Sequence, residues 1–291
     1  MRTVLALLAL TVMLPAWAQR TAQQELDDAL AEARLGHLDS ASAKVERAIA
    51  LDPALAKAYK LRGDLYQRNK NYEPAMADYK RAEDLDPNDA RLYVSRSALR
   101  ITDGNYKAAL RDADKAVDLD PTDADAWYNR ACAMYLGGDI DGALDDATKA
   151  IRLNPKHADA LYLSGVVKGE QYREEDGMAD IDAALKMKPE IPGGRMSLAV
   201  LQYESKQYED AINTFTQVIA TDTAELKAAY YYRADCYYNL DDKENACADW
   251  VKSAKLGDRD AAFINKNYCE TDATKIPKKP RRNRHKSVIQ F

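Results

Sequence analysis

Apolar and polar positions along this chain follow a pattern that returns every 34 residues. Five successive periods end at a proline, and four of these prolines follow Leu-Asp or Leu-Asn. The prolines are Pro53, Pro87, Pro121, Pro155 and Pro189. A further step of 34 leads to Thr223, where the register continues without a proline. A fixed period of this length predicts an array of similar repeats rather than one irregular domain.

Two helices are predicted in each repeat, because large and small residues recur at helical spacing. The first helix opens with the large residues Tyr59, Tyr93, Trp127, Leu161 and Tyr230. Four residues later stand the small residues Gly63, Ser97, Ala131, Gly165 and Ala234. The second helix carries small residues at two positions seven apart, beginning with Ala41 and Ala48. Small residues let two helices approach closely, and the proline that ends each repeat stops the second helix.

These positions resemble those of tetratricopeptide repeats, which have the same length. The resemblance implies an all-α, right-handed α-solenoid of about seven helix–turn–helix repeats with a C-terminal capping helix. We expect the repeats at residues 19–259, the capping helix at 260–270 and a basic tail at 271–291. The seventh repeat contains one inserted residue, and the sixth begins with the letters PGGRM. Its two glycines, Gly193 and Gly194, suggest a local bend.

An arginine in the first helix is matched four times by an aspartate 16 residues later. The pairs are Arg62 with Asp78, Arg96 with Asp112, Arg130 with Asp146, and Arg233 with Asp249. This spacing leads across the turn to the facing position of the second helix, so we predict an ion pair in each of these repeats. Asp28 and Lys44 show the inverse arrangement in the first repeat. A catalytic pair would be single, so the repeated pairs are predicted to be structural and part-buried.

The first residues of the chain differ from the repeats. A basic residue, Arg2, precedes an apolar run from Val4 to Leu14, and Ala16 and Ala18 then have the spacing of a cleavage site. We expect a signal peptide over residues 1–18. The apolar run is shorter than the about 20 residues that a membrane-spanning helix needs. The sequence predicts an exported protein of the bacterial periplasm or cell envelope, with secretion as the alternative and no transmembrane segment in the mature chain.

Four cysteines in an exported chain allow three complete pairings. Cys247 lies in the last second helix and Cys269 in the expected cap, so a disulfide between them would fasten the cap to the array. Cys236–Cys247 is the competing pair. Cys132 is predicted to pack as a small apolar residue, because no histidine lies near it in the sequence. The three histidines have no metal-ligand spacing, so neither a metal nor a cofactor is expected.

Tetratricopeptide arrays bind peptides and proteins along a concave face lined by first helices, and the resemblance implies such a groove here. The residues predicted to line it are Tyr128, Tyr135, Tyr162, Val166, Met196, Val200, Tyr203, Tyr231 and Tyr238. Tyrosine suits recognition because it buries a large ring and keeps a hydroxyl group. Family members that clamp a peptide carboxylate use repeated Lys, Asn and Arg, whereas only Asn129 and the distant Lys60 match here. We expect a partner segment with apolar side chains.

Charge is unevenly distributed along the chain, whose net charge is −5. The stretch from Lys275 to Lys286 carries seven bases and no acid: Lys275, Lys278, Lys279, Arg281, Arg282, Arg284 and Lys286. Without these seven and Arg2, 34 of the 42 Lys and Arg residues remain against 47 Asp and Glu residues, so the body carries −13. Pro277 and Pro280 prevent a continuing helix, and we expect a solvated, disordered tail.

The sequence therefore predicts a protein–protein interaction scaffold or assembly adaptor that binds a peptide or protein segment in its tyrosine-rich groove. The alternative is an envelope-associated protein whose basic tail binds an anionic partner or surface. No zinc motif, phosphate loop or nucleophile elbow is found in the sequence, so we do not expect an enzyme. Binding of nucleic acid is not expected either.

Overall fold

The computed structural model describes residues 20–277, which form two compact units. Unit 1 is the chain up to Ser95, and unit 2 begins at Arg96. The described residues form helices and turns and contain no β-strand. Within them, no helix has both the length and the apolar character that crossing a membrane requires. The predicted signal peptide at 1–18 and the tail residues 278–291 lie outside the described residues.

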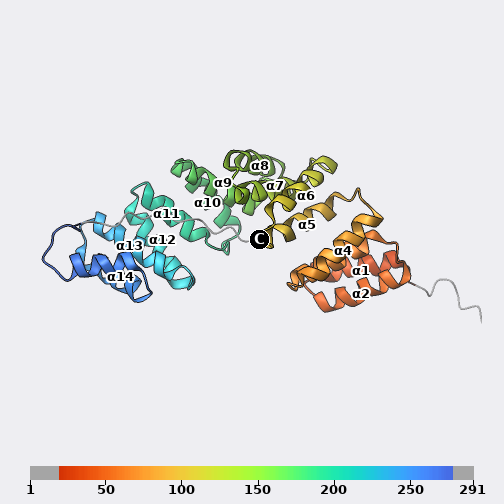
Figure 1. Ribbon diagram of the computed structural model, residues 1–291, viewed down its shortest axis with the longest axis horizontal. Helices are drawn as coiled ribbons and strands as arrows, with labels where there is room; N and C mark the ends of the chain where they lie inside the picture. Colours follow the sequence, from red (N-terminus) through yellow and green to blue (C-terminus); the bar gives the residue numbers. More distant parts are fainter. Residues whose placement is uncertain (1–19, 278–291) are drawn as a thin grey trace, which may run out of the picture. The chain divides into compact units, whose positions relative to one another are not determined.

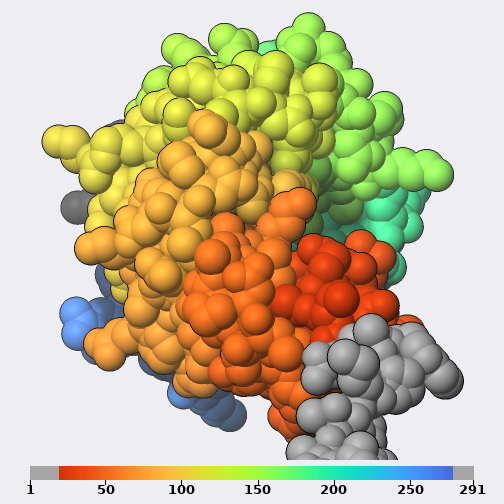
Figure 2. Space-filling model, turned by 90° about the vertical axis from the view of Figure 1, so that its right-hand side faces the viewer, coloured from red at the N-terminus to blue at the C-terminus, as the bar shows by residue number. Residues whose placement is uncertain are grey.

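Unit 1 consists of two helical hairpins and the start of a third (Figure 1). Its helices are α1 (Ala22–Arg34), α2 (Leu38–Leu51), α3 (Ala56–Arg68) and α4 (Tyr72–Leu85), and α5 (Ala90–Thr102) continues into unit 2. The core lies between the hairpins, where Leu26, Val45 and Leu65 are almost inaccessible to solvent. In Figure 2 the side chains of this unit, coloured red to orange, fill the spaces that remain between the ribbons.

Unit 2 continues the same succession of hairpins after α5. Its next helices are α6 (Tyr106–Leu119), α7 (Ala124–Gly137), α8 (Ile140–Leu153), α9 (Ala158–Glu170), α10 (Glu174–Met187), α11 (Gly194–Glu204), α12 (Tyr208–Thr221), α13 (Leu226–Asn239) and α14 (Lys243–Lys255). A short helix, α15 (Arg259–Ile264), and a π-helical turn, η1 (Asn265–Cys269), follow them. Besides the neighbours along the chain, α7 contacts α9, α9 contacts α11, and α11 contacts α13. This succession of paired helices confirms the predicted all-α repeat fold.

The small residues of the repeat lie where the two helices of a hairpin cross. Ala41, Ala75 and Ala143 are fully buried at this crossing. A Cβ atom at Gly165 would stand 2.7 Å from the carbonyl oxygen of Gly177, closer than real Cβ atoms approach a backbone. The close packing of α9 against α10 therefore requires glycine at this position.

The aromatic residue that opens the first helix has a role that the sequence did not indicate. Its polar atom donates a hydrogen bond to the carbonyl oxygen of the preceding proline. The bonds are Tyr59 Oη to Pro53 (3.3 Å), Tyr93 Oη to Pro87 (3.0 Å) and Trp127 Nε1 to Pro121 (2.9 Å). Each bond fixes the turn between one repeat and the next.

The sixth repeat departs from the period at the start of α11. In the register of α7 and α9 this helix would begin at residue 192, but it begins at Gly194. The preceding Gly193 has a φ of +68°, a left-handed conformation that glycine adopts without strain. Ile191 stands where the register places the N-cap residue, and its side chain is buried. The two glycines thus shorten the first helix of this repeat.

A disulfide joins the last hairpin to the turn that ends the array. Cys247 of α14 is bonded to Cys269 of η1, with their Cα atoms 5.5 Å apart. This pair confirms the favoured prediction, and the competing pair Cys236–Cys247 is wrong. Cys132 and Cys236 are buried free thiols. Cys132 packs in the core between α7 and its neighbours, as a small apolar residue would.

The segment after η1 packs back against α13 and α14. Lys243 Nζ donates hydrogen bonds to the carbonyl oxygens of Thr271 and Ala273, at 2.9 and 3.0 Å. Its ammonium group also lies 4.6 Å from the centre of the Tyr268 ring. Ile276 is buried and joins the core cluster of α13 and α14. The chain is therefore held to the end of unit 2 almost to the last described residue.

Candidate functional site

The four predicted ion pairs are present, and each is bidentate. Nε and Nη2 of the arginine each donate to one carboxylate oxygen of the aspartate. The two distances are 2.7 and 2.8 Å for Arg62–Asp78, 2.9 and 2.9 Å for Arg96–Asp112, 2.6 and 2.9 Å for Arg130–Asp146, and 2.6 and 3.0 Å for Arg233–Asp249. The four aspartates are at most 6 % exposed. The prediction of repeated, part-buried ion pairs is confirmed.

Three of these arginines also reach the second helix of the preceding repeat. Nη1 of Arg62 lies 3.0 Å from Glu46, that of Arg130 lies 3.3 Å from Asp114, and that of Arg233 lies 2.8 Å from Thr216 Oγ1. Sequence reasoning missed this contact, although the partners stand 16 or 17 residues upstream. The hydrogen bond to Asp78 raises the pKa of Arg62 above its usual range. A guanidinium held in this state packs three helices together and does not exchange protons near neutral pH.

Other groups stand at the same place in the remaining repeats. Lys44 Nζ lies 3.7 Å from Asp28, so the inverted pair of the first repeat is also present. In the fifth repeat, Asp180 accepts hydrogen bonds from Ser164 Oγ at 2.7 Å and from Lys168 Nζ at 2.5 Å. The cation that pairs with Asp180 is Lys168, which stands one helical turn after the position that arginine occupies in four other repeats.

A second series of side-chain hydrogen bonds joins the first helices of neighbouring repeats in unit 2. The bonds link α5 to α7, α7 to α9, α9 to α11 and α11 to α13. They are Asn129 Nδ2 to Ser97 Oγ (3.0 Å), Tyr135 Oη to Glu170 Oε1 (2.6 Å), Tyr162 Oη with Ser197 Oγ (3.0 Å) and Tyr203 Oη to Asp235 Oδ2 (3.2 Å). Sequence reasoning missed them, although separations of 32 to 35 residues correspond to one repeat.

Burial divides the nine residues predicted to line the groove. Tyr162, Val166, Met196, Val200 and Tyr231 are 1 to 4 % exposed, so their side chains belong to the core. The expectation that all nine lie open to a partner is corrected accordingly. The accessible members are the half-buried Tyr128, Tyr135, Tyr203 and Tyr238, on α7, α11 and α13. These four residues, with Glu170 and Asp241, are named the tyrosine face below.

Carboxylates lie beside the rings of the tyrosine face. Burial and the hydrogen bond to Glu170 raise the pKa of Tyr135, and burial and the charge of Asp235 raise that of Tyr203. Burial also raises the pKa of the neighbouring Tyr162 to about 12. The hydroxyl groups therefore stay protonated at neutral pH, and those of Tyr135 and Tyr203 donate to acids. The surface presents aromatic rings next to negative charge.

Unit 1 carries polar and charged side chains at the equivalent positions. Lys60 Nζ lies 2.7 Å from Asp64 Oδ2, one turn along α3. The hydroxyl of Tyr79, from α4, lies 2.9 Å from Asp64 Oδ1 and 2.8 Å from Gln67 Oε1. These groups satisfy one another within a single hairpin. The corresponding face of unit 1 therefore lacks the row of half-buried rings found in unit 2.

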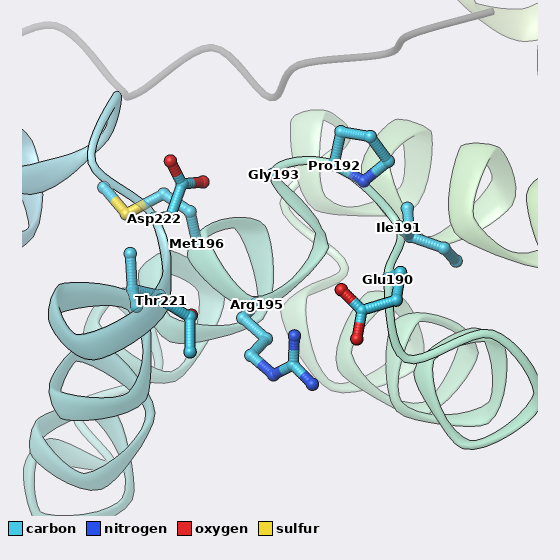
Figure 3. Close-up of a pocket in the computed structure, with 9 residues that line it drawn as sticks. Glu190, Ile191, Pro192, Gly193, Arg195, Met196, Thr221 and Asp222 are labelled. Atoms are coloured by element: carbon cyan, nitrogen blue, oxygen red, sulfur yellow. The ribbon is translucent and has the colours of Figure 1, made fainter.

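A small pocket of about 190 Å³ lies where α11 begins late. Figure 3 shows Glu190, Ile191 and Pro192 on one side of the opening and Met196, Thr221 and Asp222 on the other. Arg195 also lines the pocket, and none of its contacts within residues 20–277 is a hydrogen bond or ion pair. The lining combines one base and two acids with the apolar residues Ile191, Pro192, Met196 and Val218. The pocket follows from the late start of α11, which the sequence pattern did not predict.

The described residues offer little for metal or nucleophilic chemistry. Among them, no group of three His, Cys, Asp or Glu side chains is placed to hold a metal ion. Burial raises the pKa of the Cys132 thiol, which keeps it protonated and unreactive at neutral pH. The tyrosine face is therefore taken as the candidate site.

Antiparallel helix pairs with this period and this packing define the class of tetratricopeptide repeat proteins. The family models agree, because residues 56–89 match the model described as Tetratricopeptide repeat. Residues 92–252 match the model described as Intraflagellar transport protein 56, and this match covers more than half of the chain. The chain therefore belongs to that family as well as to the tetratricopeptide repeat proteins. The family's name states a role of its namesake and assigns none to this chain.

Several solved structures share the fold, whereas no curated protein matches the chain. PilF from Pseudomonas aeruginosa is 19% identical and covers 71% of this chain and 93% of its own, with a TM-score of 0.61. PilW, described as a widely conserved type IV pilus biogenesis factor, is 17% identical and covers 70% and 94%, with a TM-score of 0.60. A tetratricopeptide repeat protein from Parabacteroides merdae is 17% identical and covers 84% and 97%, with a TM-score of 0.56. At these identities the likeness shows a common fold.

Proposed function

We propose that this protein is a scaffold or assembly adaptor whose tyrosine face holds a segment of a partner protein. The tetratricopeptide repeat fold is a protein-interaction fold, and the observation that carries the specific proposal is the row of half-buried tyrosines on unit 2. Rings of this kind are frequent at the centres of protein interfaces, because they bury a large area with little loss of side-chain entropy. No nucleic acid, metal or cofactor is part of this proposal.

The size of the face suits an extended or helical segment. Four first helices, α7, α9, α11 and α13, contribute to it. Helices that pack together lie about 10 Å apart, so the face is about 30 Å long. An extended segment of about nine residues would cover that length. Apolar side chains of the partner would lie between the rings, while its polar groups would meet the carboxylates.

Affinity purification from cells tests this surface. Tyr135→Ser with Tyr238→Ser removes two half-buried rings of the tyrosine face. The matched control, Tyr72→Ser with Tyr106→Ser, removes two half-buried rings from the starts of the second helices α4 and α6. We expect the first variant to recover a specific partner at least about tenfold less than the wild type and the control, because each buried ring at an interface contributes about 1 kcal/mol or more.

Equal recovery by both variants, each with the helix content of the wild type, would contradict the proposal. A partner that is lost only when the seven bases from Lys275 to Lys286 are replaced by glutamine would favour the alternative function. In that case the tail binds an anionic partner or surface, and the helices only display it.

Export to the bacterial periplasm or cell envelope is part of the proposed function. Its support is the signal-like sequence at residues 1–18. Mass spectrometry of the protein from the envelope fraction should find a mature chain that begins at Gln19. A mature chain that still begins at Met1 and stays in the cytoplasmic fraction would contradict export.

A further inference from the structure

The tyrosine face has a complementary segment within this chain. We propose that the basic tail from Lys278 to Lys286 binds the tyrosine face of its own chain, so that a partner must displace it. The inference rests on the proposed function, because the tail and the partner would occupy the same surface. The tail would compete with the partner for that surface, and its charge indicates that the surface recognises cationic segments.

The acids of the tyrosine face differ from those of the ion-pair series. Each aspartate of the four arginine pairs is neutralised by a bidentate guanidinium. By contrast, Glu170 accepts a hydrogen bond from a neutral tyrosine, and neither Glu170 nor Asp241 forms an ion pair within residues 20–277. This surface therefore carries negative charge that arginine and lysine side chains could balance.

The described chain ends beside this surface. Ile276 packs into the cluster that contains Tyr231, and the half-buried Tyr238 packs against the same cluster. Lys275, Tyr238 and Asp241 line one pocket of about 590 Å³. Lys278 stands three residues after Lys275 in the sequence, and three residues span at most about 10 Å, so the α13 end of the tyrosine face is within reach of the cationic run.

The length and the chemistry of the tail fit the rest of the face. The run carries six bases and no acid: Lys278, Lys279, Arg281, Arg282, Arg284 and Lys286. Nine extended residues span about 30 Å, whereas α9, which carries Glu170, lies two helix spacings or about 20 Å from α13. Guanidinium and ammonium groups pair with carboxylates and also stack on tyrosine rings.

Tethering favours the chain's own tail over an unrelated basic peptide. A short tether gives the attached segment an effective concentration on the order of millimolar. A tail that binds with a dissociation constant of about 0.1 mM would then occupy the face in most molecules. It would lower the apparent affinity of a competing partner about tenfold.

Zero-length cross-linking of the full mature chain tests this contact. A carbodiimide joins lysine amines to carboxylates that touch them, and mass spectrometry locates the bonds. We expect Lys278, Lys279 and Lys286 to be joined to Glu170 and Asp241. The matched controls are Glu175 of α10 and Glu209 of α12, which are exposed carboxylates on second helices. The preferred cross-links should disappear at about 1 M salt, where the Debye length falls to about 3 Å.

Isotope mixing separates the chain's own tail from that of a second copy. A mixture of unlabelled and ¹⁵N-labelled protein should give cross-linked peptides of one isotope only. Mixed peptides, cross-links spread equally over Glu175 and Glu209, or no tail cross-links would each overturn the proposal. Replacing the six bases by glutamine should raise the recovery of the tyrosine-dependent partner about tenfold, and unchanged recovery would overturn the competition.

Failure of this inference differs from failure of the proposed function. If Tyr135→Ser with Tyr238→Ser loses the partner but the tail shows no preference for Glu170 and Asp241, the function stands and the tail contact falls. If the preferred cross-links form but no partner depends on the tyrosines, the tail contact stands and the partner surface lies elsewhere.

Discussion

Unit 1 and unit 2 contain the same ion pair, but they differ in the side chains along one face of the first helices of their repeats, called the first-helix face below. Arg62–Asp78 in unit 1 and Arg233–Asp249 in unit 2 have nearly identical geometry, with Nε to oxygen distances of 2.7 and 2.6 Å. On the first-helix face, Lys60 and Asp64 of unit 1 pair with each other within one helix. The equivalent face of unit 2 carries tyrosines whose hydroxyl groups reach the next first helix.

The comparison separates two tasks of a repeat. The ion pair lies between the two helices of a hairpin and reaches back to the preceding repeat, so it serves packing wherever it occurs. The first-helix face takes part in packing only through its buried members, and its half-buried positions can differ without opening the hairpin. Under the proposed function, the chemistry of recognition is concentrated in unit 2, where those positions are aromatic and acidic.

The largest effect is expected from breaking an ion pair. Asp249→Ala leaves the part-buried guanidinium of Arg233 without its bidentate partner, which should lower the free energy of unfolding by about 3–5 kcal/mol. Asp114→Ala, whose half-exposed carboxylate meets Arg130 at 3.3 Å, should cost less than about 1 kcal/mol. Urea titrations followed by circular dichroism measure both. Similar midpoints for the two variants would remove the distinction between the buried pair and its outer contact.

An alkaline titration should reveal the buried part of the first-helix face. The pKa of Tyr162 is raised to about 12, whereas an unfolded tyrosine titrates near about 10. Its contribution to stability is complete below about pH 10 and is lost as the pH rises through the folded value, with a total of about 2–3 kcal/mol. The free energy of unfolding between about pH 9 and 12 should fall more for the wild type than for Tyr162→Phe. Parallel curves would contradict the burial of this hydroxyl.

Loss of one bond between neighbouring first helices should have a smaller effect. Tyr135→Phe keeps the ring and removes the hydroxyl that donates to Glu170 at 2.6 Å. We expect a loss of about 1 kcal/mol of unfolding free energy, because the bond is part-buried and its acceptor is charged. The urea midpoint of this variant measures the loss. A midpoint equal to that of the wild type would show that the bond between α7 and α9 contributes nothing.

The smallest effect is expected in unit 1. Lys60→Ala removes the part-buried ion pair between Lys60 and Asp64, which stand one helical turn apart on α3. The loss should lower the free energy of unfolding by about 0.3–0.5 kcal/mol. Partner recovery should stay at the wild-type level, since unit 1 carries no part of the tyrosine face. Strong loss of the partner in this variant would move the binding surface into unit 1.

Contacts within one repeat could be predicted from the sequence. The arginine pairs follow from a constant separation of 16 residues, and the Cys247–Cys269 disulfide follows from the positions of a last helix and its cap. The arginine pairs depend on a hairpin whose geometry is the same each time. The repetition of the same spacing therefore identified the arginine pairs from the sequence alone.

Contacts between repeats could not be predicted in the same way. The positions of Tyr162 and Tyr203 identify a helix face, but the amount of that face covered by the next repeat depends on how successive hairpins rotate. Tyr162 is consequently 3 % exposed, while Tyr203 remains half-buried. The late start of α11 was hidden for a related reason, because Gly193 and Gly194 permit several backbone paths and only packing selects one.

Site-specific photo-cross-linking in cells tests the central claim most directly. A photoreactive phenylalanine analogue would replace Tyr135 or Tyr238 on the tyrosine face, and Tyr72 or Tyr106 on the second helices as controls. We expect irradiation to join one specific protein to the chain from positions 135 and 238 but not from 72 and 106. Adducts that form only from the second-helix positions, or equally from all four, would contradict the claim that the tyrosine face is the binding surface.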